Sequence, residues 1–179
     1  MILMKGKIQF VFKWIWVTSL GWFAAQFLGL LLTKTFYPSA KIEAIDTAPL
    51  FWLVFGLSQW FVLRDQIHST HLWILATAIG FYIGALLLKV LTLSDIIVKG
   101  LWAHILGSAI LGLAQYIVLR RRIKHAGWCL LTTTISWVLA QQIIGVQNLG
   151  IQPFGILIFT VITGFAMAWL LQYHLQDTA

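Results

Sequence analysis

The chain has 179 residues, of which 60% are hydrophobic and 9% are charged, and its mean hydropathy is +0.90. Ordinary soluble domains carry about 25% charged residues, so a soluble fold of this length lacks the polar surface needed to cover its core. The net charge of +7 at pH 7 does not indicate nucleic-acid binding, because the basic residues lie at the ends of apolar segments, where membrane topology explains them. The single cysteine, Cys129, excludes an internal disulfide and a cysteine-based metal cluster.

Six apolar segments follow one another along the chain, each near the roughly 20 residues that a helix needs to cross a hydrocarbon core about 30 Å thick. In chain order they cover residues 8–32, 48–63, 71–88, 97–119, 127–146 and 154–173. No small-residue cleavage site separates the basic start of the chain from the first segment, which predicts an uncleaved helix rather than a signal peptide. We therefore expect an all-α integral membrane protein, with residues 1–179 forming one transmembrane domain of about six transmembrane helices.

The basic residues between these segments predict the orientation in the membrane. One side receives eight of them: Lys5, Lys7, Lys13, Arg64, Arg120, Arg121, Arg122 and Lys124. The other side receives four: Lys34, Lys41, Lys89 and Lys99. Because cytoplasmic loops carry an excess of Lys and Arg, we expect both termini to lie in the cytoplasm.

Two segment ends match closely, which predicts an internal repeat. Residues 56–64 read Gly-Leu-Ser-Gln-Trp-Phe-Val-Leu-Arg, and residues 112–120 read Gly-Leu-Ala-Gln-Tyr-Ile-Val-Leu-Arg. The register continues through the following loop into the next segment, where Trp73 and Cys129 stand nine residues after the two arginines.

The other segments carry weaker copies of the same pattern. Gln26 and Gln141 stand at equivalent places in the first and fifth segments, while the sixth has Met167 at the glutamine position and Gln172 at the arginine position. We expect three tandem αα-hairpin repeats, over about residues 8–64, 71–120 and 127–173. Copies with the same orientation pack around an axis along the membrane normal, which predicts a pseudo-threefold six-helix bundle. Hairpins packed in an open row are the alternative.

The repeated Gly-x-x-Gln-aromatic-x-Val-Leu-Arg motif, the short basic loop and the Trp that opens the next helix resemble a group of uncharacterised bacterial membrane proteins, found chiefly in cyanobacteria. The resemblance covers residues 51–146 and not the two ends of the chain. It implies a multi-pass membrane fold in which the motif recurs within one chain, and a location in the bacterial plasma membrane or the thylakoid membrane. It implies no activity.

The repeated glutamines predict contacts between helices. A glutamine amide facing lipid would have no partners, so Gln59 and Gln115 should point inward and bond across helices, with Gln26 and Gln141 as further partners. We interpret these four residues as structural parts of the repeat. A polar lining for a substrate site is the alternative.

The repeated arginines, Arg64 and Arg120, stand at helix ends, where a cation complements the helix dipole and anchors the chain at the interface. A basic cluster is also typical of contact with anionic lipid. We assign that contact to Arg120, Arg121, Arg122 and Lys124. Recognition of a cofactor phosphate is the alternative.

His104 is the only histidine well inside an expected span. A neutral imidazole bonded to a neighbouring helix is the favoured interpretation, and an axial ligand to chlorophyll or haem is the alternative. No expected span contains an acidic residue, and no carboxylate pair, nucleophile elbow, zinc helix motif or phosphate loop occurs. The sequence therefore predicts no catalytic residue and no other metal site.

These features lead to a function by elimination. We expect a non-enzymatic membrane protein that acts as an accessory or assembly subunit, with membrane lipids, other membrane proteins or further copies of itself as partners, and no nucleic acid. A binder of lipid, chlorophyll, carotenoid or haem is the first alternative, in which the bound lipid or pigment is the only cofactor. A small transporter or channel is the second.

Overall fold

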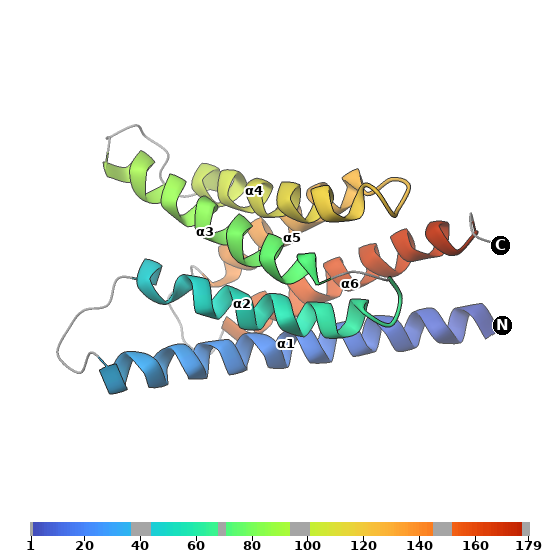
Figure 1. Cartoon of the computed structure of the whole chain (residues 1–179), viewed down its shortest axis with the longest axis horizontal. Coiled ribbons are helices and arrows are strands. Elements are labelled where there is room, and N and C mark those ends of the chain that lie inside the picture. Colours follow the sequence, from blue (N-terminus) through green and yellow to red (C-terminus); the bar gives the residue numbers. More distant parts are fainter. Residues whose placement is uncertain (1, 37–43, 68–70, 94–100, 145–151, 177–179) are drawn as a thin grey trace.

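The protein folds as a bundle of helices in a computed structural model, which describes residues 2–36, 44–67, 71–93, 101–144 and 152–176 (Figure 1). These residues form six α-helices and no strand: α1 (Ile2–Phe36), α2 (Ala44–Leu63), α3 (Leu72–Leu93), α4 (Leu101–Leu119), α5 (Gly127–Ile144) and α6 (Gln152–Gln176). Each expected apolar segment coincides with one helix. The predicted ends at Leu63 and Leu119 and the predicted start at Gly127 are confirmed, whereas residues 97–100 and 145–146 of the expected segments lie outside the described residues.

The helices form a closed ring. Each helix packs against its two neighbours in the chain, and α1 packs against α6; among the described residues no other pair of helices brings its Cα atoms within 8 Å. The expected six-helix bundle is therefore confirmed, and the alternative of hairpins in an open row is wrong. Figure 1 shows that α1 begins and α6 ends at the same end of the bundle, where α2 also connects to α3 and α4 to α5. We call this the termini end.

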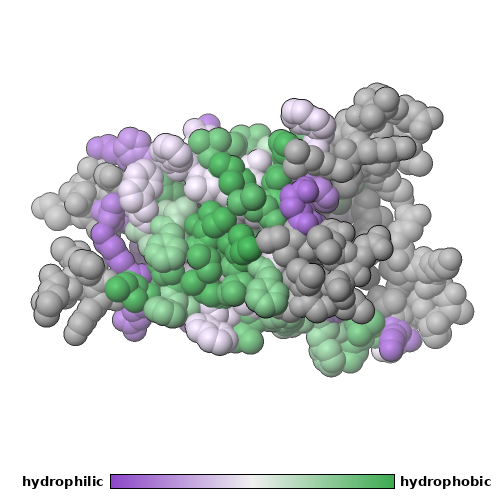
Figure 2. Space-filling view, turned by 180° about the vertical axis from the view of Figure 1, so that it is seen from behind, coloured by the Kyte–Doolittle hydropathy of each residue, from purple (hydrophilic) through white to green (hydrophobic). Residues whose placement is uncertain are grey.

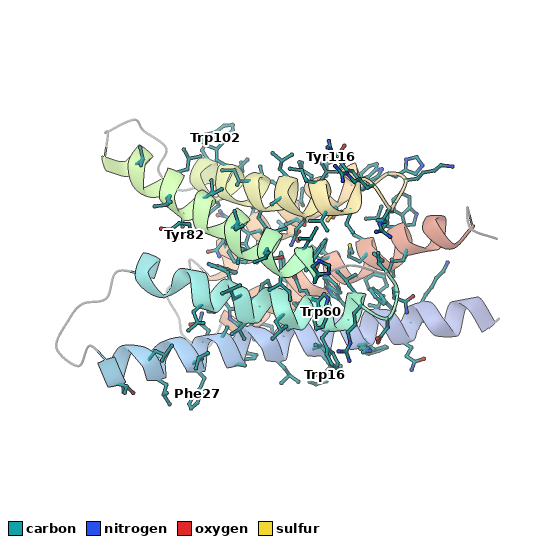
Figure 3. The ribbon with its side chains drawn as sticks, in the orientation of Figure 1. Trp16, Phe27, Trp60, Tyr82, Trp102 and Tyr116 are labelled. Atoms are coloured by element: carbon teal, nitrogen blue, oxygen red, sulfur yellow. The ribbon has the colours of Figure 1, made fainter. Side chains whose placement is uncertain are left out.

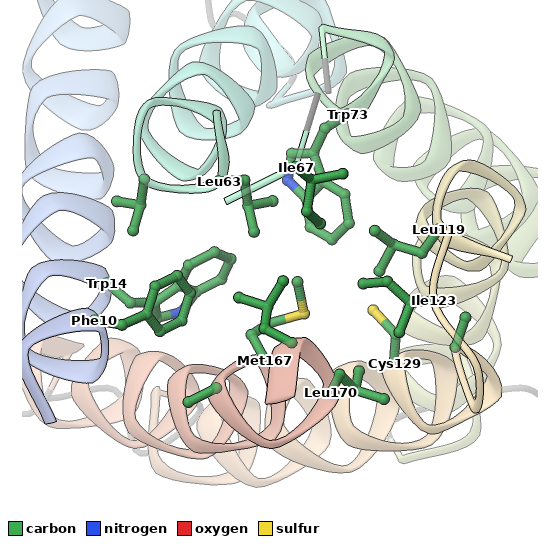
Figure 4. Packing of buried hydrophobic residues seen from close by; sticks show 14 of the residues in the cluster. Phe10, Trp14, Leu63, Ile67, Trp73, Leu119, Ile123, Cys129, Met167 and Leu170 are labelled. Atoms are coloured by element: carbon green, nitrogen blue, oxygen red, sulfur yellow. The ribbon is translucent and has the colours of Figure 1, made fainter. Parts of the chain in front are cut away.

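Large side chains fill the interior of the ring at the termini end (Figure 4). All six helices and two turns contribute to this cluster, which includes Phe10, Trp14, Leu63, Ile67, Trp73, Leu119, Ile123, Cys129, Met167 and Leu170. Leu63 and Leu119 end α2 and α4, and Ile67 and Ile123 fold back from the following turns, so the two matched segments close the bundle in the same way.

Aromatic rings fill the other half of the interior. Phe55, Phe81, Trp137 and Phe159 are buried together there, and Trp22 and Trp52 pack against them. Most of the ring pairs meet edge to face at centroid distances between 4.5 and 6.1 Å, the arrangement that the quadrupoles of aromatic rings favour.

The outside of the bundle is apolar. Large hydrophobic side chains lie exposed on all six helices; on α1 they include Phe12, Trp16 and Phe27, of which Trp16 is 64% exposed. The buried set, in contrast, includes nine polar residues, among them Thr18, Gln59 and Gln115. Figure 2 shows hydrophobic residues across the middle of one face and hydrophilic residues gathered at the termini end.

Two of the helices are long and apolar enough to cross a membrane, over Gly6–Leu32 of α1 and Phe154–Gln172 of α6, among the residues that the structure describes. The apolar parts of three others are shorter, at Leu50–Leu63, Leu72–Leu87 and His104–Leu119. A buried helix of a soluble protein or an N-terminal signal sequence meets the same two criteria. Burial and packing therefore have to distinguish a membrane-spanning helix from a buried helix of a soluble protein or a signal sequence.

Candidate functional site

A layer of polar side chains crosses the interior of the ring between its two apolar halves. Gln59 is 1% exposed and Gln115 is 2% exposed, so the prediction that both amides point inward is confirmed. Buried threonines accompany them at Thr18, Thr77 and Thr133. A buried amide needs partners in such a place, because an unpaired polar group far from water costs free energy.

Gln115 connects three helices. Its Nε2 donates to Thr77 Oγ1 of α3 at 3.3 Å, and its Oε1 accepts from Thr133 Oγ1 of α5 at 3.1 Å. The thiol of Cys129 on α5 points at the same oxygen at 3.9 Å. The side chain of Gln115 is thus a polar link between α4 and both of its neighbours.

Gln59 makes the corresponding link one hairpin earlier. Its Oε1 accepts from Trp73 Nε1 of α3 at 2.9 Å. On α6 Met167 occupies the glutamine position, and Thr163, one turn away, accepts from Trp14 Nε1 of α1 at 3.1 Å. Each of the three helix–helix interfaces α2–α3, α4–α5 and α6–α1, which we call seams, therefore contains a buried polar contact.

A small cavity lies within this polar layer, lined by Trp14, Gln59, Trp73, Gln115, Cys129, Thr132, Thr133, Phe159, Thr163 and Met167. It has room for about one water molecule. Thr18 is the one described residue with a buried side-chain oxygen or nitrogen that lacks a hydrogen-bond partner. The layer is therefore packed and polar, with little space for anything larger than water.

Glycines let the helices of these three seams approach closely. A Cβ atom added to Gly112 would lie 2.9 Å from the Cα and the carbonyl oxygen of Leu130 on α5. One added to Gly56 would lie 3.1 Å from Ile74 O on α3, and one added to Gly164 would lie 2.9 Å from the Trp14 ring. All three glycines stand three residues before the Gln59, Gln115 or Met167 position, which gives a steric reason for the Gly-x-x-Gln spacing.

Sequence reasoning missed the threonines of the polar layer. Thr18, Thr77 and Thr133 each stand four residues, about one helical turn, after Trp14, Trp73 or Cys129. Extending the self-comparison by one turn would have found them. Thr133 bonds across to α4, whereas the neighbouring Thr132 bonds within its own helix, to Trp128 O at 2.8 Å.

Gln26 and Gln141 do not join the polar layer. Gln26 is exposed on α1, so the prediction that it is a buried partner of Gln59 and Gln115 is wrong. Ala25, one residue earlier, takes the buried position because the helix turns about 100° per residue. Gln141 is half-buried, and no hydrogen bond of its side chain joins it to Gln59 or Gln115.

Basic residues gather at the termini end. The described side chains there include seven basic ones, Lys7, Lys13, Arg64, Arg120, Arg121, Arg122 and Lys124, and a single acidic one, Asp65. Lys13 bonds to Asp65 at 2.5 Å, and the Arg64 guanidinium lies 4.2 Å from the Phe61 ring centroid and 3.7 Å from Asp65. Lys7 donates to Gln172 on α6. Arg120, Arg121, Arg122 and Lys124 are all exposed, as contact with lipid headgroups requires.

His104 lies half-buried on α4, and its carbonyl oxygen accepts from Ser108 Oγ at 2.5 Å. No group of three or more His, Cys, Asp or Glu side chains that could hold a metal ion occurs within the described ranges. The structure thus places His104 apart from both the polar layer and the basic residues.

No protein-family model, no characterised protein and no solved structure matches this chain. The class of the protein is therefore defined by its own architecture: an all-α bundle of six helices in a closed ring, apolar outside and crossed inside by a polar layer.

Proposed function

We propose that this protein is a multi-pass membrane protein of the bacterial plasma membrane or thylakoid membrane, which serves as a non-enzymatic accessory or assembly subunit. Its six helices cross the bilayer, both termini lie in the cytoplasm, and its outer surface contacts lipids and other membrane proteins. The observation that carries this proposal is the exposed apolar surface on all six helices around an interior that is already filled.

The burial of α1 supports the membrane location. In the apolar window of α1 only 11% of the residues are buried, whereas the core helix of a soluble protein is mostly buried. The packing of α1 against α6, with Phe10 and Trp14 in the interior cluster, supports a retained helix over a removable signal sequence. The shortest helix, α5, has 18 residues, or about 27 Å, close to the thickness of a hydrocarbon core.

Aromatic side chains at two levels of the bundle support the same conclusion. Figure 3 places Trp16, Trp60 and Tyr116 toward the termini end and Tyr82 and Trp102 toward the other end. Trp and Tyr concentrate at both membrane–water interfaces because their rings are amphipathic. The excess of basic side chains at the termini end supports a cytoplasmic location for that end.

Filled packing along the axis supports a role for the outer surface. Leu63 and Leu119 close the axis at the termini end, Phe55 and Phe159 fill the other half, and the cavity between them has room for about one water molecule. Conduction along this axis would require these side chains to move. A pigment or lipid bound inside would require far more space.

Three hairpin copies remain part of the proposal. The glycine and the polar contact recur at each of the seams α2–α3, α4–α5 and α6–α1, at positions related by the sequence match. We propose that these seams are equivalent and that the ring has pseudo-threefold symmetry.

Labelling with a membrane-impermeant maleimide tests the location and the orientation. Cys129 is only 3% exposed, so the wild-type chain should stay unlabelled in intact cells and in inverted vesicles. Lys34→Cys should react in intact cells and Arg122→Cys only in inverted vesicles, because the two positions lie at opposite ends of the bundle. Release of the chain from membranes by alkaline carbonate would contradict the proposal.

The subunit role is tested in the native membrane. The chain should comigrate with a larger membrane complex in mild detergent, and deletion of its gene should lower the amount of that assembled complex until the wild-type chain is restored. A chain that migrates alone, with every complex at its normal level in the deletion strain, would contradict the role.

Visible absorbance separates this role from pigment binding. We expect the purified chain to be colourless. A coloured protein whose colour is lost in His104→Gln, and kept in a His71→Gln control at the termini end, would replace the subunit role with pigment binding.

A further inference from the structure

Two turns at the termini end share the same backbone hydrogen bonds over residues 64–67 and 120–123. In the α2–α3 turn, Arg64 N donates to Trp60 O at 2.9 Å and Ile67 N donates to Leu63 O at 2.9 Å. In the α4–α5 turn the corresponding donors are the amides of residues 120 and 123, at 2.8 and 2.9 Å. The buried isoleucine of each turn packs into the same interior cluster. The exposed side chains of both turns are therefore presented from matching positions.

The charges on the two turns differ. The α2–α3 turn carries Asp65 and Gln66 after its arginine, and Asp65 neutralises Lys13 and lies near Arg64. At the same two positions the α4–α5 turn carries Arg121 and Arg122, directly after Arg120. Three consecutive guanidinium groups are thus exposed on one turn, and both ion pairs among the described residues belong to Asp65 instead.

The surroundings of the α4–α5 turn fit a headgroup region. Trp128 follows the turn on α5 and is half exposed, and its ring meets the Trp169 ring of α6 edge to face at 6.2 Å. Tyr116 lies one helical turn before Arg120. Indole and phenol rings occupy the headgroup level of a bilayer, and arginine binds phosphate through several planar N–H donors.

We propose that the α4–α5 turn binds the phosphate of an anionic phospholipid through Arg120, Arg121 and Arg122, and that the matching α2–α3 turn does not. This inference rests on the proposed membrane location. The occupant is a lipid rather than free phosphate because exposed apolar side chains, Ile117 before the arginines and Trp128 after them, offer a surface on which the acyl chains of a bound lipid can lie. Each arginine near an anionic surface adds about fivefold to the preference for anionic lipid.

The test measures lipid binding to the purified full-length chain in detergent by native mass spectrometry. The probes are dioleoylphosphatidylglycerol and dioleoylphosphatidylcholine, which share acyl chains and differ in headgroup charge. The wild-type chain should retain the anionic lipid in preference. The double variant Arg121→Asp/Arg122→Gln, which installs the α2–α3 turn sequence, should lower binding of the anionic lipid at least about fivefold and leave binding of the neutral lipid unchanged.

Matched controls keep the proposal open to disproof. Arg64→Gln removes a cation from the α2–α3 turn and should leave the preference unchanged, because Arg64 is followed by Asp65 and Gln66 instead of two further arginines and lies 3.7 Å from the Asp65 carboxylate. Arg121→Gln/Arg122→Gln removes charge without adding an acid and replaces the first double variant if that one does not fold. Equal wild-type binding of both lipids, or an equal loss in Arg64→Gln, would overturn the proposal.

One further outcome distinguishes a lipid site from a site for free phosphate. Another distinguishes failure of the lipid proposal from failure of the proposed membrane location. Displacement of the anionic lipid by millimolar inorganic phosphate would show a site for free phosphate and overturn the lipid assignment. A chain that withstands carbonate extraction but lacks the lipid preference overturns this inference alone. A chain that carbonate releases overturns the membrane location as well.

Discussion

The α2–α3 hairpin and the α4–α5 hairpin share their helix packing and differ in their polar contacts and in the charges on their turns. Both pack a glycine against the next helix, bury a glutamine three residues later, and fold an isoleucine back from the turn. Their polar contacts differ, because Gln59 accepts from a large indole on Trp73, whereas Gln115 bonds to two threonines and faces the small Cys129 thiol. Their turns carry opposite charges at the same position, Asp65 and Arg121.

The comparison shows what the two seams share: the two helices approach closely at a glycine, and a buried polar side chain bonds between them. The residue that partners this polar side chain differs from one seam to the other. The seam between α6 and α1 extends the same point, because Thr163 and Trp14 bond there beside Met167. Matched substitutions in the two hairpins test which of these features each seam requires.

The largest effect should follow Trp73→Cys, which gives the α2–α3 hairpin the smaller residue of the α4–α5 hairpin. The indole is 1% exposed and beside the axial cavity, so its removal enlarges that cavity and leaves Gln59 Oε1 without its donor. We expect a loss of about 3–5 kcal/mol in the free energy of unfolding, measured by denaturant titration in mixed micelles. Trp16→Cys, at an exposed position on α1, is the control; an equal loss there would contradict the packing role of Trp73.

Gly112→Ala should have the next largest effect. The added methyl would press on the backbone of Leu130, which cannot rotate away, so we expect a loss of about 1–3 kcal/mol in the same titration. Gly56→Ala should cost less, since its nearest atoms lie at 3.1 Å. Gly29→Ala meets nothing within 4 Å and should not destabilise the fold. Stability of Gly112→Ala equal to that of Gly29→Ala would remove the close-approach explanation of the motif.

Gln115→Met should cost about 1–2 kcal/mol, because it leaves Thr77 and Thr133 without their shared partner. Gln59→Met should cost less, because only the Trp73 bond is lost. The two variants test whether the glutamine of the α4–α5 hairpin has the larger structural role, with melting temperatures in one detergent as the readout. A larger drop in melting temperature for Gln59→Met than for Gln115→Met would show that the number of hydrogen bonds does not set the contribution of each glutamine to stability.

Asp65→Asn should have the smallest effect, confined to a range of pH. The hydrogen bond from Lys13 holds the pKa of the Asp65 carboxyl below its usual value, and the charges of Lys13 and Arg64 act in the same direction. A carboxyl with a lowered folded-state pKa stabilises the fold above its ordinary pKa of about 3.9 and loses this contribution as the pH falls through the folded-state value. The melting temperatures of wild type and Asp65→Asn should therefore differ at pH 7 and converge once the pH falls below the folded-state pKa of Asp65. A difference in melting temperature that stays constant with pH would show that the carboxylate charge of Asp65 does not contribute to stability.

Hydropathy predicted the helices well because each apolar run ends at a polar or basic residue, as at Leu63 before Arg64 and Leu119 before Arg120. The inward direction of Gln59 and Gln115 was also predictable, because an amide needs partners in an apolar environment. The exposure of Gln26 was not predictable, because the weak match of the first segment did not define its alignment with the other segments to the residue. A shift of one residue along a helix turns a side chain by about 100°. The bonds of Thr77 and Thr163 depend on which helices become neighbours, and no pattern within a single helix specifies that.

The seam between α1 and α6 has a consequence for synthesis of the chain. Translation produces α1 first and α6 last, yet Trp14 bonds to Thr163, 149 residues later, and Lys7 bonds to Gln172, 165 residues later. Until α6 leaves the ribosome, α1 and α5 each lack the neighbour against which they pack in the finished ring. The edge of α1 carries Trp14 and the edge of α5 packs against α6 in the finished ring, so both contacts form only after the last helix has been made. Arrival of the last helix is the event that seals the interior.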